Sequence, residues 1–469
     1  MAMEDRAVTY GMLDAAITRC AHRITALDIP PGGLVAVEVQ NRIRHLTLCL
    51  ALFRSGVASV SLAPGQAAEA GLTLAVRLGD TPADGSAHAG RSVAVTDAWF
   101  SDDIAAGALP PGFSDGSQIC RISLTSGSTG QPKAVTYTVR ELARRMQRFV
   151  GFVDMSHTGV LCLPGLSSNF GFTAAAATLF AGRKACFSQS PYQAASLIEL
   201  FSLDVAIAAP EQLLALTRVA RKLHAQPASL RTITIAGDRP THVLLEAAAQ
   251  HLCRDIRCLY GASETGPIAL ANACDVVRHP GLAGHVLPGN EVAVFTARDT
   301  RCAAGELGAV AVRANDDAGA ARRWIDVGDI GWIADDGQLH VLGRASELEP
   351  VKLVRAPTQD ISPGHEVEHA LRLEWDVTDA AAVLVEPAGA TPQIWIGVVD
   401  NGGASADQLA ALARARGIAH DIRIVDLAAI PRSVNGKIRR IELKAAMLAA
   451  SPSPSAPAAS RTESAGSPA

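Results

Sequence analysis

The chain alternates between two kinds of apolar spacing. From Tyr10 to Leu27 apolar residues recur every three or four positions, which predicts an amphipathic helix, and Leu34 to Val39 alternates as a strand does. The pattern from Cys120 to Val139 predicts two short strands around a loop rich in Gly, Ser and Thr. The middle of the chain repeats strand and helix, with strands expected at 205–208, 232–235 and 256–259 and helices at 210–223 and 241–252.

This order of elements predicts the fold class. Strands that alternate with helices form doubly wound, mostly parallel sheets, because each helix returns the chain to the same end of the sheet. Ligands of such α/β sheets bind at the carboxyl ends of the strands. The polar clusters of this sequence directly follow predicted strands, so we expect a ligand site at those strand ends.

The C-terminal part follows a different pattern. Short β segments with Gly and Asp turns predict a β subdomain over residues 285–342. A new set of elements follows residue 344. It has a helix from about Pro363, apolar strands at 382–385 and 394–399, and a final helix from Ile438. We expect an N-terminal domain over 1–343, a small α+β domain over 344–448 and a disordered Ser/Pro/Ala-rich tail over 449–469.

Composition narrows the class of protein. The net charge is −4, from 42 Lys and Arg against 46 Asp and Glu, so we expect no partner among nucleic acids. The longest mostly apolar run, 170–182, is too short for the roughly 20 residues that span a bilayer, and residues 1–10 show no secretory signal. Nine cysteines without a CxxC pair predict buried free thiols in a reducing cytoplasm, ahead of a disulfide framework or a metal site.

The sharpest motif is TSGSTGQPK, residues 125–133. Its two glycines allow close approach of backbone N–H groups, its four hydroxyls donate, and Lys133 supplies positive charge, which together suit a polyphosphate. The motif is not a Walker A sequence, and it lies between two predicted strands, so no helix dipole contributes. The alternative is a flexible surface hairpin, since Gly/Ser/Thr clusters usually mark turns.

A second polar cluster, YGASE at residues 260–264, follows a predicted strand. Tyr260 offers an aromatic face for a purine, Ser263 a hydroxyl for a phosphate, and Glu264 a carboxylate for Mg²⁺. The alternative is a strand-to-turn junction with a solvated acid.

Three charged side chains in later turns complete the candidate chemistry. The Asp329 carboxylate can accept both hydroxyls of a ribose, and the Arg344 guanidinium suits phosphate or ribose oxygens. Lys437 lies beside a glycine in the basic segment PRSVNGKIRR, residues 431–440. Taken singly, the Asp329 and Arg344 segments are more typical of turns with a solvated ion pair, and the lysine segment is typical of a basic surface loop.

Taken together and in this order, the motifs resemble those of the adenylate-forming (ANL) superfamily of acyl-CoA synthetases, adenylation domains and luciferase-like AMP-binding enzymes. The resemblance covers about residues 8–445 and is carried chiefly by the phosphate loop and the C-terminal lysine motif. It implies a large α/β N-terminal domain, a small mobile C-terminal domain, and ATP, Mg²⁺ and CoA as cofactors of a reaction on a small carboxylic acid.

The resemblance also implies a role for each group. The β- and γ-phosphates of ATP would be held by Thr125, Ser126, Gly127, Ser128, Thr129, Gly130 and Lys133. The adenine would be lined by Gly237, Asp238, Arg239 and Tyr260, the ribose held by Asp329, and the ribose or phosphates by Arg344. Ser263 and Glu264 would act at the α-phosphate and Mg²⁺, and Lys437 would reach the carboxylate and α-phosphate oxygens. The acid pocket would include Ser168, Asn169, Phe170 and Gly261, and Glu347 would be the hinge of the mobile domain.

Several positions depart from the family pattern. Ala356 and Pro357 stand where the family has a glycine loop beside the pantetheine arm, which bears on the thiol step. Ser168 or Asn169 occupies the place of the family's histidine or aromatic gate, and the aspartate that holds an α-amino group is absent, which disfavours an α-amino acid substrate. Phe170 and its neighbour Phe172 either line the acid pocket or belong to the core.

Residues 365–369, HEVEH, match the zinc-peptidase pattern HExxH, but they coincide with a structural element of the family.

From the resemblance we expect an AMP-forming acid–thiol ligase that makes an acyl-adenylate, releases pyrophosphate and transfers the acyl group to CoA. The alternatives are an adenylation enzyme that loads an acyl or peptidyl carrier protein, and a catalytically degenerate nucleotide-binding protein.

Overall fold

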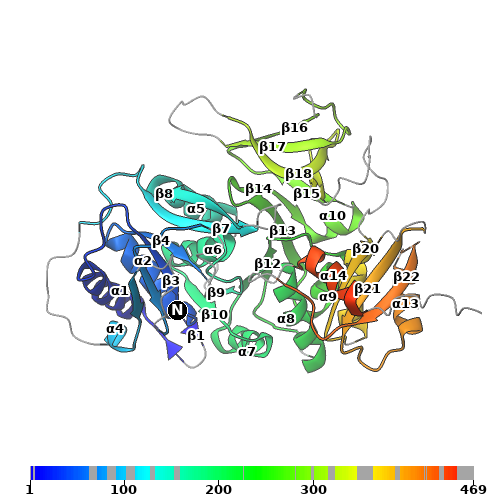
Figure 1. Ribbon diagram of the computed structural model, residues 1–469, viewed down its shortest axis with the longest axis horizontal. Coiled ribbons are helices and arrows are strands. Elements are labelled where there is room, and N and C mark those ends of the chain that lie inside the picture. The colour runs from blue at the N-terminus through cyan, green and yellow to red at the C-terminus, as the bar shows by residue number, and fades with distance from the viewer. Residues whose placement is uncertain are drawn as a thin grey trace, which may run out of the picture. The chain divides into compact units, whose positions relative to one another are not determined.

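The structure is a computed structural model in which the chain divides into two compact units, Met1–Ile361 and Ser362–Ala469 (Figure 1). It describes residues 2–3, 6–62, 71–81, 91–101, 111–126, 132–152, 159–224, 226–279, 281–296, 300–314, 323–345, 363–375, 377–385, 391–416, 418, 420–432 and 438–450. The expected domain boundary at 343/344 stays a prediction, and the expected tail lies outside the described residues.

The first unit contains a six-stranded sheet with the strand order β6-β5-β3-β4-β7-β8. All neighbours in it are parallel except β7 and β8, which form an antiparallel hairpin. The strands are β3 (Leu34–Glu38), β4 (Ala58–Ser61), β5 (Val76–Gly79), β6 (Arg91–Ala94), β7 (Ile119–Ser126) and β8 (Pro132–Thr138). The helices of this part are α1 (Tyr10–Thr25), α2 (Arg42–Arg54), α4 (Ala98–Ser101) and α5 (Val139–Phe152).

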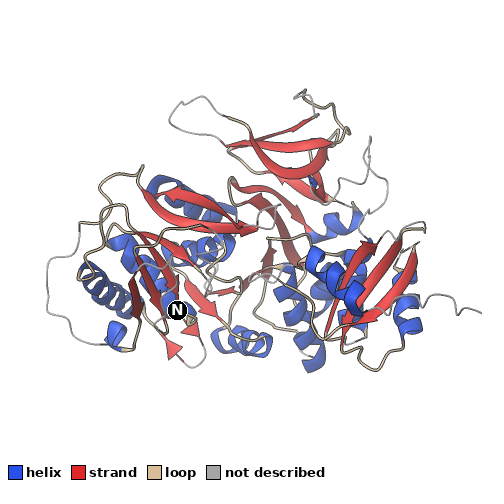
Figure 2. Ribbon diagram, viewed as in Figure 1, coloured by secondary structure: helices blue, strands red, loops and turns tan. Residues whose placement is uncertain are grey.

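A second, 13-stranded sheet has a parallel half, in which β1, β10, β9, β11, β12 and β13 are neighbours in that order. Helices α8 and α9 pack together beside these strands (Figure 2). The strands are β1 (Ala2–Met3), β2 (Arg6–Ala7), β9 (Gly159–Cys162), β10 (Lys184–Phe187), β11 (Val205–Ala208), β12 (Thr232–Ile235) and β13 (Asp255–Ala262). The helices are α6 (Asn169–Phe180), α7 (Pro191–Phe201), α8 (Pro210–Leu223), α9 (His242–His251) and α10 (Ala273–Arg278).

Beyond β13 every described strand pairing toward β16 is antiparallel, which makes the β subdomain expected from the sequence. The strands are β14 (Gly266–Asn272), β15 (Leu282–Val286), β16 (Asn290–Phe295), β17 (Gly308–Ala314), β18 (Ile325–Ile333) and β19 (Leu339–Arg344). The fold class predicted from the sequence is therefore confirmed: parallel, doubly wound sheets with an attached β subdomain.

Local sequence explains where these elements begin. Thr9 accepts a hydrogen bond from the backbone N–H of Met12 and so caps α1, and Ser168 caps α6 through Gly171. Pro210 occupies the first position of α8, where its missing N–H costs no helical hydrogen bond. The helix at 210–223 and the strands at 205–208 and 232–235 are confirmed at the expected residues.

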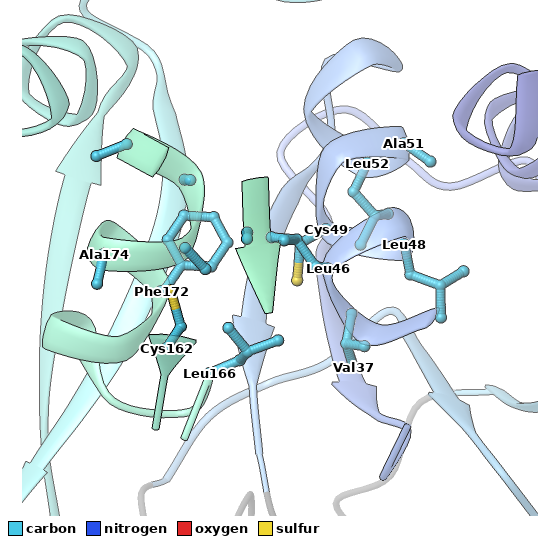
Figure 3. Close-up of a cluster of buried hydrophobic side chains, with 14 of the residues drawn as sticks. Val37, Leu46, Leu48, Cys49, Ala51, Leu52, Cys162, Leu166, Phe172 and Ala174 are labelled. Carbon is cyan, nitrogen blue, oxygen red and sulfur yellow. The ribbon is translucent and has the colours of Figure 1, made fainter. Parts of the chain in front are cut away.

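The core of the first unit includes a layer in which α2 faces α6 and the loop before it. Leu46 and Cys49 on α2 point toward Leu166 and Phe172 on the other side, and all four side chains are buried (Figure 3). Removing apolar area from water on this scale is the main favourable term in folding. The packed layer gives a rigid base to the strands whose ends carry the polar clusters.

The second unit is an α+β fold around one three-stranded sheet. Strand β21 pairs antiparallel with β20 and parallel with β22. The elements are α12 (Pro363–Glu374), β20 (Asp379–Val385), β21 (Gln393–Val399), α13 (Ala406–Ala415), β22 (Asp421–Asp426) and α14 (Arg440–Ala450). The sequence pattern predicted α12, β20, β21 and α14, whereas α13 and β22 were not predicted.

All nine cysteines are free, as predicted, but the expectation that all are buried is wrong for two of them. Cys274 is exposed near the start of α10, and Cys302 is half-buried. No helix among the described residues is long and apolar enough to cross a membrane.

A buried carboxylate ties α12, β20 and α14 together. Glu368 is 1% exposed; it accepts a hydrogen bond from the backbone N–H of Ala382 at 2.8 Å and pairs with Arg440 at 2.7 Å. His365 approaches it at 3.2 Å. Burial alone would raise the pKa of Glu368, but Arg440 and His365 outweigh burial and hold that pKa well below its usual range.

This pair predicts a pH-dependent stability of the second unit. Because the folded-state pKa of Glu368 is depressed, its contribution is complete above the unfolded value of about 4.3 and is lost as pH falls further. We expect Glu368→Gln to destabilise the unit by about 2 kcal/mol at pH 7, since it leaves Arg440 without its anion. Hydrogen exchange of the β20 amides in the full chain measures the loss.

The matched control is Glu374→Gln on the same helix, whose partner Arg416 lies near the surface. An ion pair of that kind stabilises by about 1 kcal/mol at most. Equal protection of β20 in the two variants at pH 7, or an advantage of the wild type over Glu368→Gln that does not shrink as pH falls from about 4 toward about 2, would contradict the assignment.

Candidate functional site

Three antiparallel hairpins of the first unit carry most of the predicted site residues that the structure describes. Hairpin β7–β8 carries Thr125 and Lys133, which are register partners. The turn after β13 carries Ser263 and Glu264, and hairpin β18–β19 pairs Asp329 with Arg344. Hairpin β13–β14 contacts both of the others. Its Glu264 side chain reaches hairpin β7–β8, and its Tyr260 side chain reaches hairpin β18–β19.

The contact with the first hairpin is ionic. The Nζ of Lys133 lies 3.8 Å from an Oε1 of Glu264, and the Lys133 side chain is 68% exposed. Thr125 Oγ1 donates to the carbonyl of Lys133 at 3.3 Å, which fixes the start of β8. A pair this open to water stabilises by about 1 kcal/mol at most, so an arriving phosphate can take over the lysine.

The contact with the third hairpin is a partly buried hydrogen bond. Tyr260 Oη donates to Asp329 Oδ2 at 2.6 Å, and Arg344 Nε lies 3.3 Å from Oδ1 of the same carboxylate. Burial, together with the Asp329 charge and hydrogen bond, raises the pKa of Tyr260 far above its usual range, so the phenol stays protonated. Each carboxylate oxygen keeps lone-pair capacity, so Asp329 can still accept from the hydroxyls of a ligand.

Glycine is required where the β13–β14 hairpin closes. A Cβ on Gly261 would lie 2.6 Å from the carbonyl oxygen of Gly266, closer than real Cβ atoms come. Gly266 itself has a φ of +78°, which favours glycine. The narrow closure brings β13 and β14 together beside the turn that bears Glu264.

The other predicted adenine-side residues lie in a turn after β12. Gly237 has a φ of +98°, and a side chain added there would meet nothing within 4 Å. The Asp238 carboxylate accepts from the backbone N–H of Arg239 at 2.8 Å. Because this turn directly follows β12, it stands at the carboxyl end of a parallel strand, where ligands of α/β sheets bind.

The predicted acid-pocket residues lie at the start of α6. Ser168 donates to the carbonyl of Gly165 at 2.8 Å, and Asn169 Oδ1 accepts from Thr173 at 3.4 Å. The ring of Phe170 packs against Phe149, with centroids 6.1 Å apart. These side chains shape the helix start as capping and packing groups.

Phe172, which the sequence left open between pocket and core, belongs to the core. It is 4% exposed, and the buried guanidinium of Arg121 lies over its ring at 3.5 Å. Arg121 also donates to the carbonyl of Leu166 at 3.0 Å, so it holds the loop that leads into α6.

Several predicted site residues lie outside the described residues: Gly127, Ser128, Thr129 and Gly130 of the phosphate loop, the proposed hinge Glu347, and Lys437. Ser126 is described as the last residue of β7. In the HExxH segment, Glu368 is engaged with Arg440 and His369 is 1% exposed. Among the described residues, no group of three His, Cys, Asp or Glu side chains is arranged to hold a metal ion.

Sequence reasoning missed two side chains that contact the Glu264 turn. Tyr137 on β8 donates to the carbonyl of Ser263 at 3.0 Å, and Arg145 on α5 donates to the carbonyl of Glu264 at 2.9 Å. Their targets are backbone oxygens more than 100 positions away, which leave no mark in a motif. The alternation of β8 and the helical spacing of α5 only place them on a face.

The arrangement suits a nucleotide triphosphate with a divalent cation. Lys133 offers countercharge to phosphates, and Glu264, 30% exposed, offers one carboxylate to a Mg²⁺ ion. One carboxylate is enough, because Mg²⁺ at nucleotide sites keeps several waters and takes other oxygens from the phosphates. Asp329 and Tyr260 provide acceptors and an aromatic face on the other side of the hairpin.

Comparisons with known proteins agree with this chemistry. The family model described as AMP-binding enzyme matches residues 1–318. The chain is 26% identical over 336 residues to the uncharacterized acyl–CoA ligase YhfT of Bacillus subtilis, covering 69% of this chain and 67% of that protein. It is 25% identical over 496 residues to an oxalate–CoA ligase of Arabidopsis thaliana, covering 92% of each. Other relatives are much longer, and the chain spans 26% of phosphinothricin tripeptide synthetase PhsC of Streptomyces viridochromogenes.

Among solved structures, O-succinylbenzoate coenzyme A synthetase (MenE) of Bacillus subtilis in complex with ATP and magnesium ion has the same fold. It matches with a TM-score of 0.75 at 23% identity, over 94% of this chain and 95% of that one. The family model covers well over half of the chain, and it spans the motifs of hairpins β7–β8 and β13–β14. The chain belongs to the family of AMP-binding enzymes, the adenylate-forming superfamily.

Proposed function

We propose that this protein activates a small carboxylic acid with ATP and then transfers the acyl group to the thiol of CoA. In the first step a carboxylate oxygen attacks the α-phosphorus, the bond from that phosphorus to the bridging oxygen breaks, and pyrophosphate leaves. In the second step a thiol sulfur attacks the acyl carbon, AMP leaves with the bonding pair, and the thiol proton passes to solvent. The first half-reaction is the one that the described residues support directly.

The observation that carries the proposal is that hairpin β13–β14 meets both of its neighbours, one through Glu264 and the other through Tyr260. Attack of a carboxylate on a phosphate brings two anions together, so the protein must supply position and countercharge. Lys133 and Glu264 stand 3.8 Å apart on neighbouring hairpins, where phosphates and a cation need one group of each sign. Asp329, held by Tyr260 and Arg344, stands on the next hairpin to take the ribose hydroxyls.

Glu264 would hold the Mg²⁺, which when bound supplies positive charge to the triphosphate. Ser263 would donate to the α-phosphate, and Thr125 with the rest of the loop through Lys133 would hold the β- and γ-phosphates. Gly237, Asp238 and Arg239 would border the adenine. Lys437 would come from the second unit, with Glu347 as the hinge that lets it leave before thiol transfer.

The acid would bind near the start of α6, beside Ser168 and Asn169. Their polar groups are taken up in capping and helix contacts, and Phe170 adds an apolar edge. This lining suits a small acid without a second charge at that end. Nine free cysteines fit a reducing compartment, and we place the reaction in the cytoplasm.

Exchange of labelled pyrophosphate into ATP, across a panel of carboxylic acids, tests the first step. We expect exchange with some acid and a loss on the order of 10²–10³ in Lys437→Ala, because a preorganised donor to the reacting oxygens is removed. Lys444→Ala, on the nearby helix α14, is the control and should retain the wild-type rate. ATP binding without exchange for any acid would instead favour a nucleotide-binding protein with another role.

Thioester formation with an acid that supports exchange tests the second step. We expect an acyl-CoA product that is resolved by mass spectrometry, with AMP released in equal amount. If only a phosphopantetheine-bearing carrier protein accepts the acyl group, the CoA assignment is wrong and the adenylation assignment stands.

Nucleotide affinity tests the Asp329 assignment. Asp329→Ala should weaken ATP binding about tenfold or more, since the ribose loses its acceptor and the buried Tyr260 hydroxyl and Arg344 lose their partner. Asp326→Ala, an exposed carboxylate on the same strand, is the matched control. Calorimetric titration measures both, and equal affinities for the two variants would refute the role.

A further inference from the structure

Two side chains outside the predicted motifs donate hydrogen bonds to the backbone of the turn that carries Glu264. Tyr137 Oη donates to the carbonyl of Ser263 at 3.0 Å, and Arg145 Nη2 donates to the carbonyl of Glu264 at 2.9 Å. Two consecutive peptide groups are therefore fixed in orientation. These two peptide planes flank the Cα of Glu264, so holding both of them sets the direction of its Cα–Cβ bond.

The two donors support each other. The Arg145 guanidinium lies over the Tyr137 ring at 4.6 Å, a cation–π contact, and Tyr137 is 1% exposed. Gly266, which ends the turn, leaves the guanidinium its room, because a Cβ there would come within 3.2 Å of Arg145 Nη1. Donor, ring and glycine form one packed unit behind the turn.

The same strand that carries Tyr137 also carries Lys133. Lys133 reaches the Glu264 carboxylate at 3.8 Å, while Tyr137, four residues later on β8, reaches the backbone beside it. Strand β8 thus fixes the turn and supplies the charge that faces its carboxylate. Movement of the turn relative to β8 would separate the lysine from the carboxylate.

We propose that Tyr137 and Arg145 are positioning residues, which hold the Glu264 carboxylate where it takes the divalent cation of the bound nucleotide. The inference rests on the proposed function for the identity of that ligand. Neither side chain touches the nucleotide in this role. Arg145 also places a positive charge beside the turn. Burial lowers the pKa of Arg145, and Tyr137, Glu141 and Glu264 offset only part of that lowering.

The test is the magnesium dependence of ATP binding, measured by calorimetry with and without Mg²⁺ on the full chain. In wild type, Mg²⁺ should strengthen ATP binding. Tyr137→Phe keeps the ring and removes one donor, so the strengthening should fall about threefold, and Arg145→Met should reduce it about tenfold. Arg145→Lys retains a donor and a charge and should recover part of the loss.

The matched control is Arg140→Met on the same helix, which removes an exposed guanidinium that faces Asp115 at 4.0 Å. It should leave the magnesium effect at the wild-type value. Thermal unfolding of each variant accompanies the titrations, because a role in stability alone would lower the midpoint and leave the ratio of affinities with and without Mg²⁺ unchanged. Such a result overturns the inference, and the isosteric Tyr137→Phe keeps the test valid if Arg145→Met fails to fold.

Pyrophosphate exchange on the same proteins separates this inference from the proposed function. If wild type binds Mg·ATP but exchanges with no acid, the proposed function fails and the titrations still decide the positioning role. If wild type exchanges but the variants keep the full magnesium effect, the positioning role fails alone. Absence of any magnesium effect in wild type overturns the inference as well, because Glu264 then holds no cation.

Discussion

The candidate site depends on hairpin β13–β14 holding its two neighbours in register. Glu264, in its turn, meets Lys133 of hairpin β7–β8, and Tyr260, on its strand, meets Asp329 of hairpin β18–β19. β13 is the last strand of the parallel run and the first of the antiparallel one, so the hairpin stands where the sheet changes direction. Both sides of the site therefore contact the same short piece of chain. The closure of that hairpin leaves no room for a Cβ at Gly261.

The charges are distributed differently on the two sides of that hairpin. On the Asp329 side the carboxylate is 7% exposed and keeps Tyr260 and Arg344 as fixed partners, so it is preorganised and changes little when a ligand arrives. On the Glu264 side the pair with Lys133 is open to water and weak, and both groups can exchange their partner for a phosphate or a cation. A firm acceptor for an uncharged sugar and a loose ion pair for a charged triphosphate match the two ends of a nucleotide.

The sequence predicted the alternation of β11, α8 and β12 well, because each is a local pattern. Strand β11 is a run of four apolar residues, β12 alternates Thr with Ile, and α8 has a proline at its start with three- and four-residue spacing behind it. The sequence also placed Tyr260 and Glu264 where a strand ends, but it expected Asp329 and Arg344 in turns, whereas both lie in strands, β18 and β19. It could not find Tyr137 or Arg145, because their partners are backbone carbonyls of residues 263 and 264, and every residue has such a carbonyl. Strand β22 was missed because it is short and only Val425 of its residues is buried. The fate of Phe172 depended on Arg121, 51 positions away in the chain.

Two ion pairs of the second unit hold the described residues that flank segment 433–437. Arg432 pairs with Asp379 at 2.6 Å, and Arg440 pairs with Glu368 at 2.7 Å, so the residues on both sides of segment 433–437 are tied to the two ends of one framework, α12 and β20. Both carboxylates are largely buried, and a buried ion pair is costly to break from either side. The described residues that flank this segment are therefore anchored to β20 and α12 within the second unit.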